Sequence, residues 1–345
     1  MKYSLVLPLI VAAGLVAAQS PTSVIGNGWG LDHVIVAVSS PDVVKQVFVN
    51  ELGFSPITRN QFPASGLENT IVVLPPVAYI ELAWPYQPPG AGARPVTFLV
   101  RQTLEAGGGP AAYNLDVSSA EGAADAMRRL GLRVSLSASV VAKGADGKET
   151  RAPWQFADID PSDQAMQPYG VPGGPGVGFL EYQNQADRLK PERFQMTLDR
   201  AAREAPDPRR SAGEIHPNTA RKLLSVWVVV PDAADAVKQA GRFGFAPTKN
   251  HPKALGEEGQ EVQCGEGTIV FFEAAHPNSA LAILVKKRGL GPFGISVGVA
   301  DLKTAQRIVQ EGAHASFEIQ HAENRMSFVV PSQVAAGTVF EFVQQ

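Results

Sequence analysis

The sequence predicts an α+β protein in which one βαβββ module occurs four times. Hydrophobic residues make up 45% of the 345 residues and charged residues 18%, which is typical of a globular chain. The 33 glycines and 27 prolines favour many short strands joined by turns over a helical bundle. Because one module cannot bury its sheet and its helix alone, we expect two domains of paired modules. Each domain would be a curved mixed β-sheet that forms a cup, with helices outside.

The N-terminal segment is typical of a secretory signal peptide. Lys2 precedes an apolar run of about 14 residues that ends in small residues at Ala18. Such a run is too short to span a bilayer comfortably. We therefore expect a signal peptide over residues 1–18, cleaved near Ala18, and a mature protein that is secreted or periplasmic and not bound to a membrane.

The first module begins with an apolar, β-branched strand over 31–38. Ser40 can cap a following helix, Pro41 suits its first turn, and Gly53 ends it. Two more strands follow, of which the last is 78–83. The module therefore reads strand, helix, then about three strands.

The same order recurs three more times along the chain. The first strand, the helix and the closing strand lie at 113–117, 118–131 and 178–182 in the second module, at 224–230, 231–244 and 269–273 in the third, and at 295–299, 301–312 and 338–343 in the fourth. In the second module, Ser118 and Glu121 have the spacing of a capping box.

The spacing within the modules supports the repeat. From the first-strand positions His33, Ala112, Ser225 and Gly294, the closing glutamates Glu81, Glu181, Glu273 and Glu341 follow after 48, 69, 48 and 47 residues. The one long interval contains a segment rich in Gly, Pro, Asp and Ser, over 143–176. We expect this insertion to be a surface loop near a functional pocket.

The modules divide the chain into a first domain over 28–186, a linker over 187–222 and a second domain over 223–345. The linker is charged and poor in strand signals. A short helix is expected over 190–204, and His216 in the following loop is expected to be solvated.

Three short segments resemble the vicinal oxygen chelate (VOC) superfamily, and in particular its glyoxalase-like domain proteins. They are the opening strand Gly30–Val38, the Gly66–Asn69 turn and the closing Tyr79–Leu82. The resemblance covers nearly the whole chain as paired modules and implies two VOC-type domains. The superfamily includes glyoxalase I, extradiol dioxygenases, epimerases, thiol transferases and bleomycin-resistance proteins that sequester a drug. The motifs therefore indicate the superfamily better than a reaction.

The resemblance also implies a site. Side chains alternate along a strand, and Glu81 belongs on the cup face because an unpaired buried carboxylate is costly. In relatives, the positions of His33 and the closing glutamates bind a divalent metal. This implies His33, Glu81 and Glu181 as ligands of Fe²⁺, Mn²⁺, Ni²⁺ or Zn²⁺, with Glu81 and Glu181 also catalytic. Ala112 departs from the pattern, which leaves three ligands and one open position. A metal-free pocket and a structural remnant remain alternatives.

Other residues complete the predicted site. Arg59 and Asn69 flank the cup and could bind substrate oxygens, and Trp154 in the insertion could close the pocket. In the second domain, Ser225 and Gly294 stand where ligands would be expected. We expect that domain to be degenerate, with a structural or interaction role.

Several function classes are excluded or disfavoured. A net charge of −3 does not fit a nucleic-acid partner, and a single cysteine rules out a disulfide framework. Without a phosphate-binding glycine loop, no nucleotide cofactor is expected. The leading hypothesis is an exported, metal-dependent enzyme acting on a small vicinal-oxygen substrate, of the lyase, isomerase or dioxygenase type. The alternative is a metal-free protein that binds or sequesters a small molecule. The sequence gives no signal of the oligomeric state.

Overall fold

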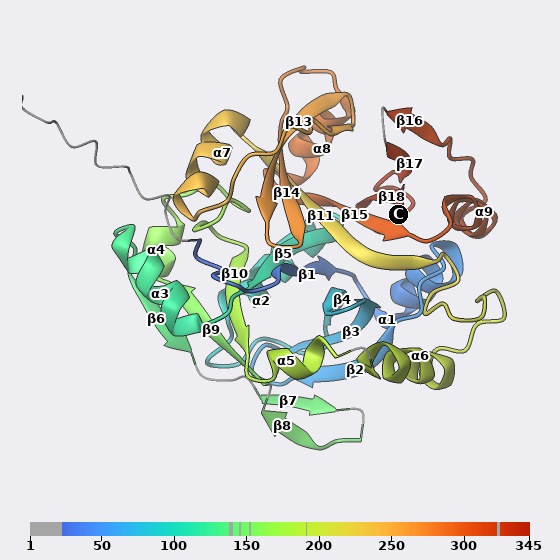
Figure 1. Cartoon of the computed structure of the whole chain (residues 1–345), viewed down its shortest axis with the longest axis horizontal. Coiled ribbons are helices and arrows are strands. Elements are labelled where there is room, and N and C mark those ends of the chain that lie inside the picture. The colour runs from blue at the N-terminus through green and yellow to red at the C-terminus, as the bar shows by residue number, and fades with distance from the viewer. Residues whose placement is uncertain (1–22, 138–140, 145, 152, 191, 323–324) are drawn as a thin grey trace, which may run out of the picture.

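The computed structural model describes residues 23–137, 141–144, 146–151, 153–190, 192–322 and 325–345. The predicted signal peptide, residues 1–18, lies outside the described residues. The chain forms two mixed β-sheets that pack against each other, with helices at both ends and on the outside (Figure 1). The predicted α+β architecture of four βαβββ modules paired into two cups is confirmed.

The first sheet consists of the first two modules. Within the described residues its order is β6-β9-β10-β5-β1-β4-β3-β2-β7-β8. The strands of the first module are β1 (Gly30–Ala37), β2 (Ile57–Phe62), β3 (Leu67–Leu74) and β4 (Ala78–Pro85), and those of the second are β5 (Gly109–Asp116), β6 (Val134–Ser137), β9 (Trp154–Ile159) and β10 (Val177–Tyr182). The predicted insertion adds a hairpin, β7 (Val141–Gly144) and β8 (Glu149–Arg151), which pairs with β2.

The second sheet repeats this arrangement with the last two modules. Its order is β12-β13-β14-β11-β15-β18-β17-β16. The strands are β11 (Ala220–Val230), β12 (Lys253–Ala254), β13 (Glu257–Cys264), β14 (Gly267–Glu273), β15 (Gly291–Val299), β16 (Gln320–Ala322), β17 (Arg325–Val330) and β18 (Val339–Gln344). In both sheets the first strands of the two modules, β1 with β5 and β11 with β15, run antiparallel at the centre.

Each module contributes a helix after its first strand. These helices are α1 (Pro41–Val43), which continues as the π-helix η1 (Val44–Glu51), then α3 (Ala120–Arg129), α7 (Ala233–Arg242) and α9 (Leu302–Ala313). A side-chain oxygen caps each N-terminus, from Ser40, Ser119, Asp232 and Asp301. The cap of α3 is Ser119 and not the predicted Ser118, whose hydroxyl instead accepts a hydrogen bond from the Asn27 amide.

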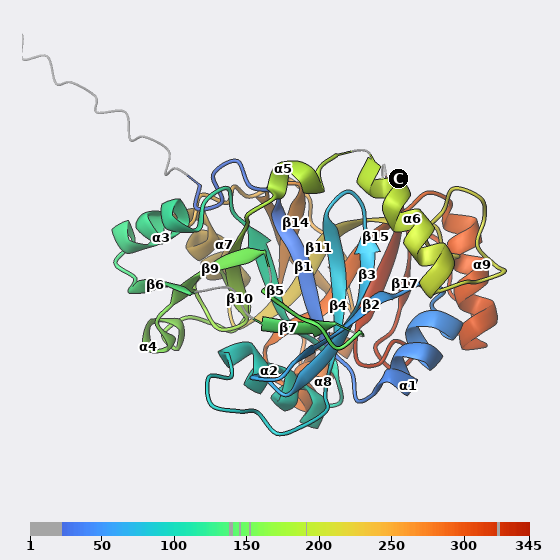
Figure 2. The ribbon, with the colours of Figure 1, turned by 90° about the horizontal axis from the view of Figure 1, so that it is seen from below.

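The sequence analysis missed two helices, α2 (Pro95–Glu105) and α8 (Ala280–Arg288), which connect the modules within each half. The insertion also contains α4 (Pro161–Gln164). The linker forms α5 (Gln185–Arg188) and α6 (Glu192–Glu204), so the helix expected in this segment is confirmed. Both linker helices lie along the first sheet, as Figure 2 shows from below. No helix of the described residues has the length and apolar character needed to cross a membrane.

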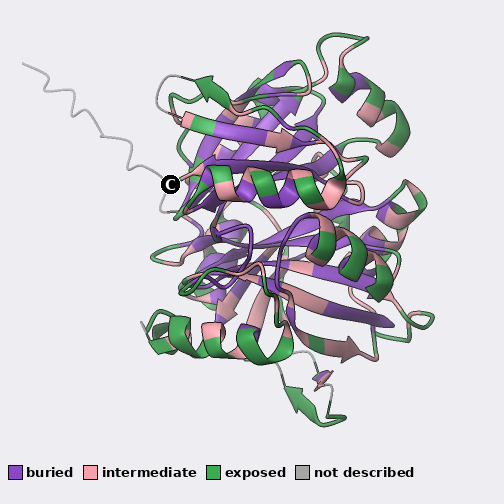
Figure 3. Ribbon diagram, turned by 90° about the vertical axis from the view of Figure 1, so that its right-hand side faces the viewer, coloured by how far each residue is buried: buried purple, intermediate pink, exposed green. Residues whose placement is uncertain are grey.

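The main core lies between the two sheets. Alternate residues of the central strands, such as Val34 and Val36 of β1 and Val226 and Val228 of β11, are fully buried there. Figure 3 shows these buried strands in the middle of the molecule and exposed helix surfaces around them. The opposite face of each sheet is therefore the concave one. Helix α2 covers part of the first cup and α8 covers part of the second.

Candidate functional site

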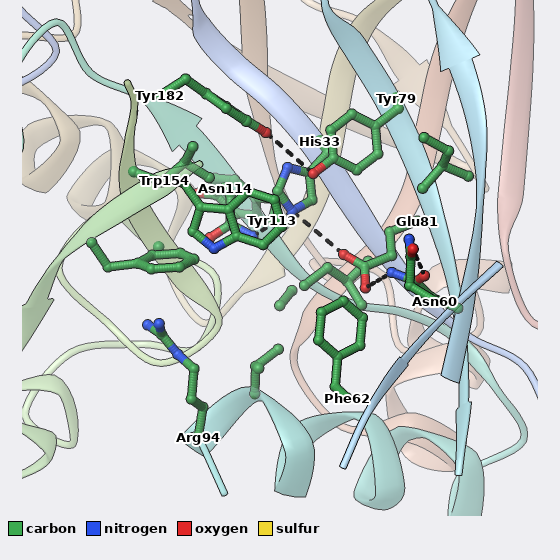
Figure 4. A pocket seen from close by; sticks show the side chains of 18 of the residues that line it. His33, Asn60, Phe62, Tyr79, Glu81, Arg94, Tyr113, Asn114, Trp154 and Tyr182 are labelled. Carbon is green, nitrogen blue, oxygen red and sulfur yellow. Dashed lines mark hydrogen bonds and ion pairs between the residues drawn. The ribbon is translucent and has the colours of Figure 1, made fainter. Parts of the chain in front are cut away.

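The cup of the first sheet encloses a cavity of about 1380 Å³. Its walls come from the central strands of that sheet and from the linker helices. Polar side chains from β1, β4 and β5 and aromatic side chains from β9 and β10 project into it (Figure 4). Among them, His33, Glu81 and Asn114 lie together, with Trp154 and Tyr182 on the facing wall.

A β-bulge in β1 brings two consecutive residues to this site. Leu31 pairs with Leu115 and His33 pairs with Asn114, so Asp32 is an extra residue without a partner position on β5. In a regular strand, Asp32 and His33 would point to opposite faces. The bulge changes the direction of the Asp32 side chain, so its carboxylate contacts the imidazole ring of His33.

His33 is held from three sides and is 4% exposed. Its Nδ1 lies 2.5 Å from Asp32 Oδ2, its Nε2 lies 2.7 Å from Asn114 Nδ2, and its ring stacks on Tyr79 with the centroids 4.3 Å apart. An ionised carboxylate only accepts hydrogen bonds, so Nδ1 carries the hydrogen. In the neutral imidazole, Nε2 is therefore the acceptor, and its lone pair receives a hydrogen bond from Asn114 Nδ2 at the wall of the cavity.

Asp32 is completely buried and has three partners. Besides His33, Tyr182 donates its hydroxyl hydrogen to Oδ2 at 3.0 Å, and Arg188 Nη2 donates to Oδ1 at 2.9 Å. Burial alone would raise the pKa of Asp32. The hydrogen bond from His33 and the positive charge of Arg188 outweigh burial and lower this pKa, so the carboxylate is ionised.

Glu81 faces His33 across the mouth of the cavity. Its Oε2 lies 3.6 Å from His33 Nε2, and its Oε1 accepts a hydrogen bond of 2.7 Å from Asn69 Nδ2 (Figure 4). Asn69 is oriented in turn by Asn60 on the neighbouring strand. One carboxylate oxygen is therefore fixed by an amide, while the other points to the imidazole.

Two tyrosines complete the wall behind His33. The hydroxyl groups of Tyr79 and Tyr182 lie 3.3 Å apart. Burial raises the pKa of both far above the usual tyrosine value, and the Tyr182 hydroxyl is also next to the negative charge of Asp32. Both phenols therefore stay protonated and serve as hydrogen-bond donors.

The structure does not bring Glu181 to this site. Gly178, Leu180 and Tyr182 of β10 line the cavity, whereas Phe179 faces the core on the other side of the sheet and Glu181 alternates to that same side. The Glu181 carboxylate accepts a hydrogen bond of 2.8 Å from the Ala120 amide at the start of α3. Glu273 does the same for Ala233 of α7, at 3.4 Å. Placing Glu181 with His33 and Glu81 was wrong: it binds a helix N-terminus.

Strand register explains the error. Glu81 lies two residues beyond the partner of His33 on β4. On β10 the partner of Asn114 is Gly178, and the residue two positions beyond it is Leu180. Leu180 is therefore the counterpart of Glu81. The prediction differed by one residue, and one residue in a strand exchanges the two faces.

The counterpart of His33 in the second module was also misplaced. Ala112 pairs with Ile35, whereas His33 pairs with Asn114, two residues further along β5. Asn114 is on the same face as Ala112 and fills the place where a second ligand had been expected. The bulge in β1 shifts this register, and the sequence pattern carried no mark of it.

The three predicted substrate-binding residues have different outcomes. Asn69 and Trp154 line the cavity. Arg59 does not: its side chain is 59% exposed and forms an ion pair with Glu68 beside the cup. His216, in the linker, is not solvated but completely buried. Its Nδ1 accepts a hydrogen bond from the Ser55 amide, and its Nε2 donates one to the Val73 carbonyl.

Sequence reasoning missed four contributors to the site: Asp32, Asn114, Tyr182 and Arg188. The adjacent Asp32-His33 pair was visible, but strand alternation argued against contact. Tyr182 follows Glu181, and the face assignment excluded it. Arg188 lies in the linker, where no strand pattern indicated a position near the cup.

The donor set of the cup does not fit the predicted three-ligand metal centre. His33 supplies one nitrogen and Glu81 one carboxylate, and the third group that reaches them is the amide of Asn114. Among the described residues, no three His, Cys, Asp or Glu side chains converge on one point. Transition metals usually take at least three imidazole, thiolate or carboxylate ligands. Metal binding by His33 and Glu81 therefore stays a prediction.

Comparisons with known proteins agree with this architecture. A family model described as a glyoxalase-like domain matches residues 31–244. A search of the curated proteins gives no match.

Solved structures with a similar fold include three that span most of this chain. A hypothetical protein from Staphylococcus aureus is 10% identical, with a TM-score of 0.56 over 91% of this chain and 99% of that one. A mutant 4-hydroxymandelate synthase from Streptomyces coelicolor is 12% identical, with a TM-score of 0.57 over 92% of both chains. A fusion of a xylose isomerase-like TIM barrel with a 4-hydroxyphenylpyruvate dioxygenase is 12% identical, with a TM-score of 0.54 over 97% of this chain and 51% of that one.

At these identities the likeness of the solved structures shows the fold, while the family model covers well over half of the chain. The chain therefore belongs to the glyoxalase-like domain family of the vicinal oxygen chelate superfamily.

Proposed function

We propose that this chain is an enzyme that binds a small molecule with adjacent oxygens in the cup of the first sheet and transfers a proton with His33. The observation that supports this most strongly is the buried Asp32–His33 pair, whose Nε2 faces the cavity 3.6 Å from Glu81. A buried carboxylate that fixes the tautomer of a histidine is a recurrent arrangement for a general base.

The chemistry follows from the positions of the donors. A carbon acid next to a carbonyl gives its proton to His33 Nε2, and the electron pair of the C–H bond moves onto the carbonyl oxygen. The hydrogen on Nδ1 stays on the ring and hydrogen-bonded to Asp32, whose negative charge stabilises the imidazolium. Asn114 Nδ2, which donates to His33 Nε2 in this structure, has to leave that lone pair before the transfer and can then donate to the developing oxyanion. Return of the proton to the neighbouring carbon, together with transfer of the hydroxyl proton to the former carbonyl oxygen, gives an isomer. Return of a proton to the same carbon, after the imidazolium has exchanged with solvent, gives hydrogen exchange.

Glu81 is placed to act on the second oxygen of the ligand. Its free Oε2 can accept the hydrogen of a hydroxyl group on the adjacent carbon, while Asn69 holds Oε1. His33 would take a proton from carbon and Glu81 a proton from oxygen, and this pair of groups suits a substrate with two vicinal oxygens.

The test is solvent exchange of carbon-bound hydrogen. Glycolaldehyde, dihydroxyacetone and acetoin would be incubated in D₂O with the wild-type protein, with His33→Ala and with Glu81→Gln, and followed by proton NMR. We expect exchange that requires His33 and that persists after chelator treatment. Exchange that disappears with the chelator and returns with added Fe²⁺, Mn²⁺, Ni²⁺ or Zn²⁺ would replace this proposal by the metal-dependent one.

A second candidate is a binding protein without turnover. The specific observation in its favour is Asn114, whose Nδ2 lies 2.7 Å from His33 Nε2 and occupies the lone pair that a base needs. Binding of a compound in the same panel with no exchange in any variant would favour this candidate. Asn114→Ala should then leave exchange absent, whereas it should alter the exchange rate of an enzyme.

We also propose export of the mature chain, on the basis of the N-terminal apolar segment. Sequencing the N-terminus of the protein recovered from outside the cytoplasm would check it. A chain that retains residues 1–18 would contradict cleavage near Ala18.

A further inference from the structure

We propose that the ligand of the first cup carries a carboxylate group, which Arg188 Nη1 and Trp154 Nε1 bind. This inference rests on the proposed function, because it names the ligand class of the same site. It also gives the linker a role: Arg188 comes from α5, which follows the first sheet and precedes the second in the chain, and it lines a cavity that belongs to the first sheet.

Arg188 uses only part of its guanidinium group within the protein. Nη2 donates to Asp32 Oδ1 and to the Val77 carbonyl, both at 2.9 Å. The guanidinium carbon lies 3.2 Å from the centre of the Tyr182 ring, which fixes the plane of the group. Nη1 is buried and has no hydrogen-bond partner within the described residues. A buried charged donor without an acceptor is rare, because it loses its water without compensation.

Trp154 provides a second donor of the same kind. Its ring contacts the edge of Tyr182 with the centroids 6.1 Å apart, and its indole Nε1–H is also buried without a partner in the described part of the chain. Indole nitrogen is a donor only, so this position requires an acceptor. Two unpaired donors thus contact the same tyrosine and line the same cavity.

The charge of the lining favours an anion. Six arginines line the cavity: Arg94, Arg133, Arg188, Arg193, Arg200 and Arg203. Four carboxylates also line it, and Arg94, Arg133, Arg188 and Arg200 form ion pairs with Asp158, Asp160, Asp32 and Glu204. The excess of positive charge therefore comes from Arg193 and Arg203, which have no ion pair within the described residues. Positive charge around a low-dielectric cup attracts anionic ligands.

A carboxylate matches the two donors better than a neutral oxygen does. Its two oxygens accept hydrogen bonds in one plane, and guanidinium is the side chain that recognises this geometry best. The rings of Trp154 and Tyr182 leave room for an apolar body next to the acid. We therefore expect a small organic acid whose reacting carbon faces His33 and Glu81.

The experiment compares acids with their neutral amides. Phenylacetate and phenylacetamide, and lactate and lactamide, would be titrated by NMR into the wild-type protein. We expect each acid to bind at least about 10-fold more tightly than its amide, because hydrogen bonds to a charged acceptor are the stronger ones. In Arg188→Met this preference should fall to near unity, while binding of the amide is retained.

Matched variants separate ligand recognition from folding. Arg193→Met removes another arginine of the lining, one whose Nε is bonded to the Asp187 carbonyl, and should keep the preference for acids. Arg188→Met leaves Asp32 buried without its cation, so the same substitution is also made together with Asp32→Asn. Trp154→Phe removes the N–H donor while keeping an aromatic ring, and should weaken binding of the acids severalfold and more than binding of the amides.

Two outcomes would overturn the inference. The first is that the wild-type protein binds the acids no more tightly than the amides, or does not bind the acids. The second is that both Arg188 variants keep the preference for acids. Neither result bears on His33. His33→Ala should lose exchange and keep the preference for acids, so failure of the ligand class and failure of the proposed function are distinguishable.

Discussion

The cups of the two sheets have the same strand order but contain different side chains. In the first cup, His33, Asn114 and Glu81 face a cavity of about 1380 Å³. In the second cup, Ser225 and Ser296 form the pair that corresponds to His33 and Asn114. The rings of Trp227, Phe272 and Phe293 pack together next to them and against α8, with centroid distances of 5.5 to 5.9 Å.

The two cups also differ in whether their polar groups have hydrogen-bond partners. In the second, Glu341 binds Ser296 Oγ and Arg325, and Trp227 Nε1 donates to Ser225 at 3.1 Å. In the first, the corresponding kinds of donor, Trp154 Nε1 and Arg188 Nη1, have no partner within the described residues. The polar groups named here are paired with one another in the second cup, whereas two donors of the first cup are unpaired. This difference is the reason for placing the proposed function in the first cup.

The largest expected effect is on activity. His33→Ala should lower the exchange rate by roughly 10² to 10⁴-fold, the usual contribution of a general base. Ser225→Ala, at the corresponding position of the second cup, should leave the rate unchanged. Proton NMR in D₂O measures both, with circular dichroism to check folding. A comparable loss in Ser225→Ala would mean that the two cups do not differ as proposed.

The two tryptophans should differ in stability. Trp227→Ala removes a ring packed on all sides and should lower the free energy of unfolding by about 3–5 kcal/mol. Trp154 borders an open cavity, so Trp154→Ala should cost about 1 kcal/mol or less, as for residues outside a core. Urea unfolding of both variants makes the measurement. Similar losses would show that the first cup is as tightly packed as the second.

His216 should make the junction between the sheets sensitive to acid. It contacts Val73 of the first sheet and packs on Phe54, which in turn contacts Phe340 and Phe342 of the second. Burial lowers the pKa of His216 to about 4 from an ordinary value of 6.5. The unfolded state therefore binds the extra proton, and stability falls as the pH decreases from 6.5 toward 4.

The expected loss through His216 is on the order of 3 kcal/mol, from about 1.4 kcal/mol per pH unit. Urea unfolding of the wild type and of His216→Gln at several pH values between 4 and 7 would show it, as a steeper pH dependence in the wild type. His251→Gln, at an exposed histidine, is the control and should keep the wild-type slope.

The smallest expected effect is a gain of function in the first cup. Leu180 is the counterpart of Glu81, so Leu180→Glu would add a second carboxylate next to His33. We expect weak uptake of divalent metal, because three suitable ligands would then converge. Elemental analysis after dialysis against Zn²⁺ or Mn²⁺ would detect it. Uptake that survives in the His33→Ala, Leu180→Glu double variant would place the metal elsewhere.

Local patterns predicted much of the fold. The strand at 31–38, the helix starts at Ser40 and Asp232 and the linker helix all follow from apolar periodicity and capping residues, which depend on neighbours in the chain. Helices α2 and α8 were missed because their apolar faces pack mainly on the cups, which are formed by distant strands.

The site was predicted only in part, for a related reason. His33, Glu81, Asn69 and Trp154 were placed in the cup from strand alternation and from resemblance, and they line the cavity. The position of each glutamate in the closing strand of its module also suggested that Glu181 and Glu273 correspond to Glu81. The register shows that they bind helix N-termini instead. Spacing along the chain counts residues, whereas the face of a strand depends on which residue lies opposite.

The sequence by itself determined the repeated module, the paired arrangement and the presence of a histidine and a glutamate in one cup, because these depend on residue type and periodicity. The tertiary structure decided the rest. A bulge joined Asp32 to His33, the pairing of β1 with β5 selected Asn114, and the linker brought Arg188 to the buried carboxylate. These contacts bring together residues up to 156 positions apart, and no local pattern specifies them.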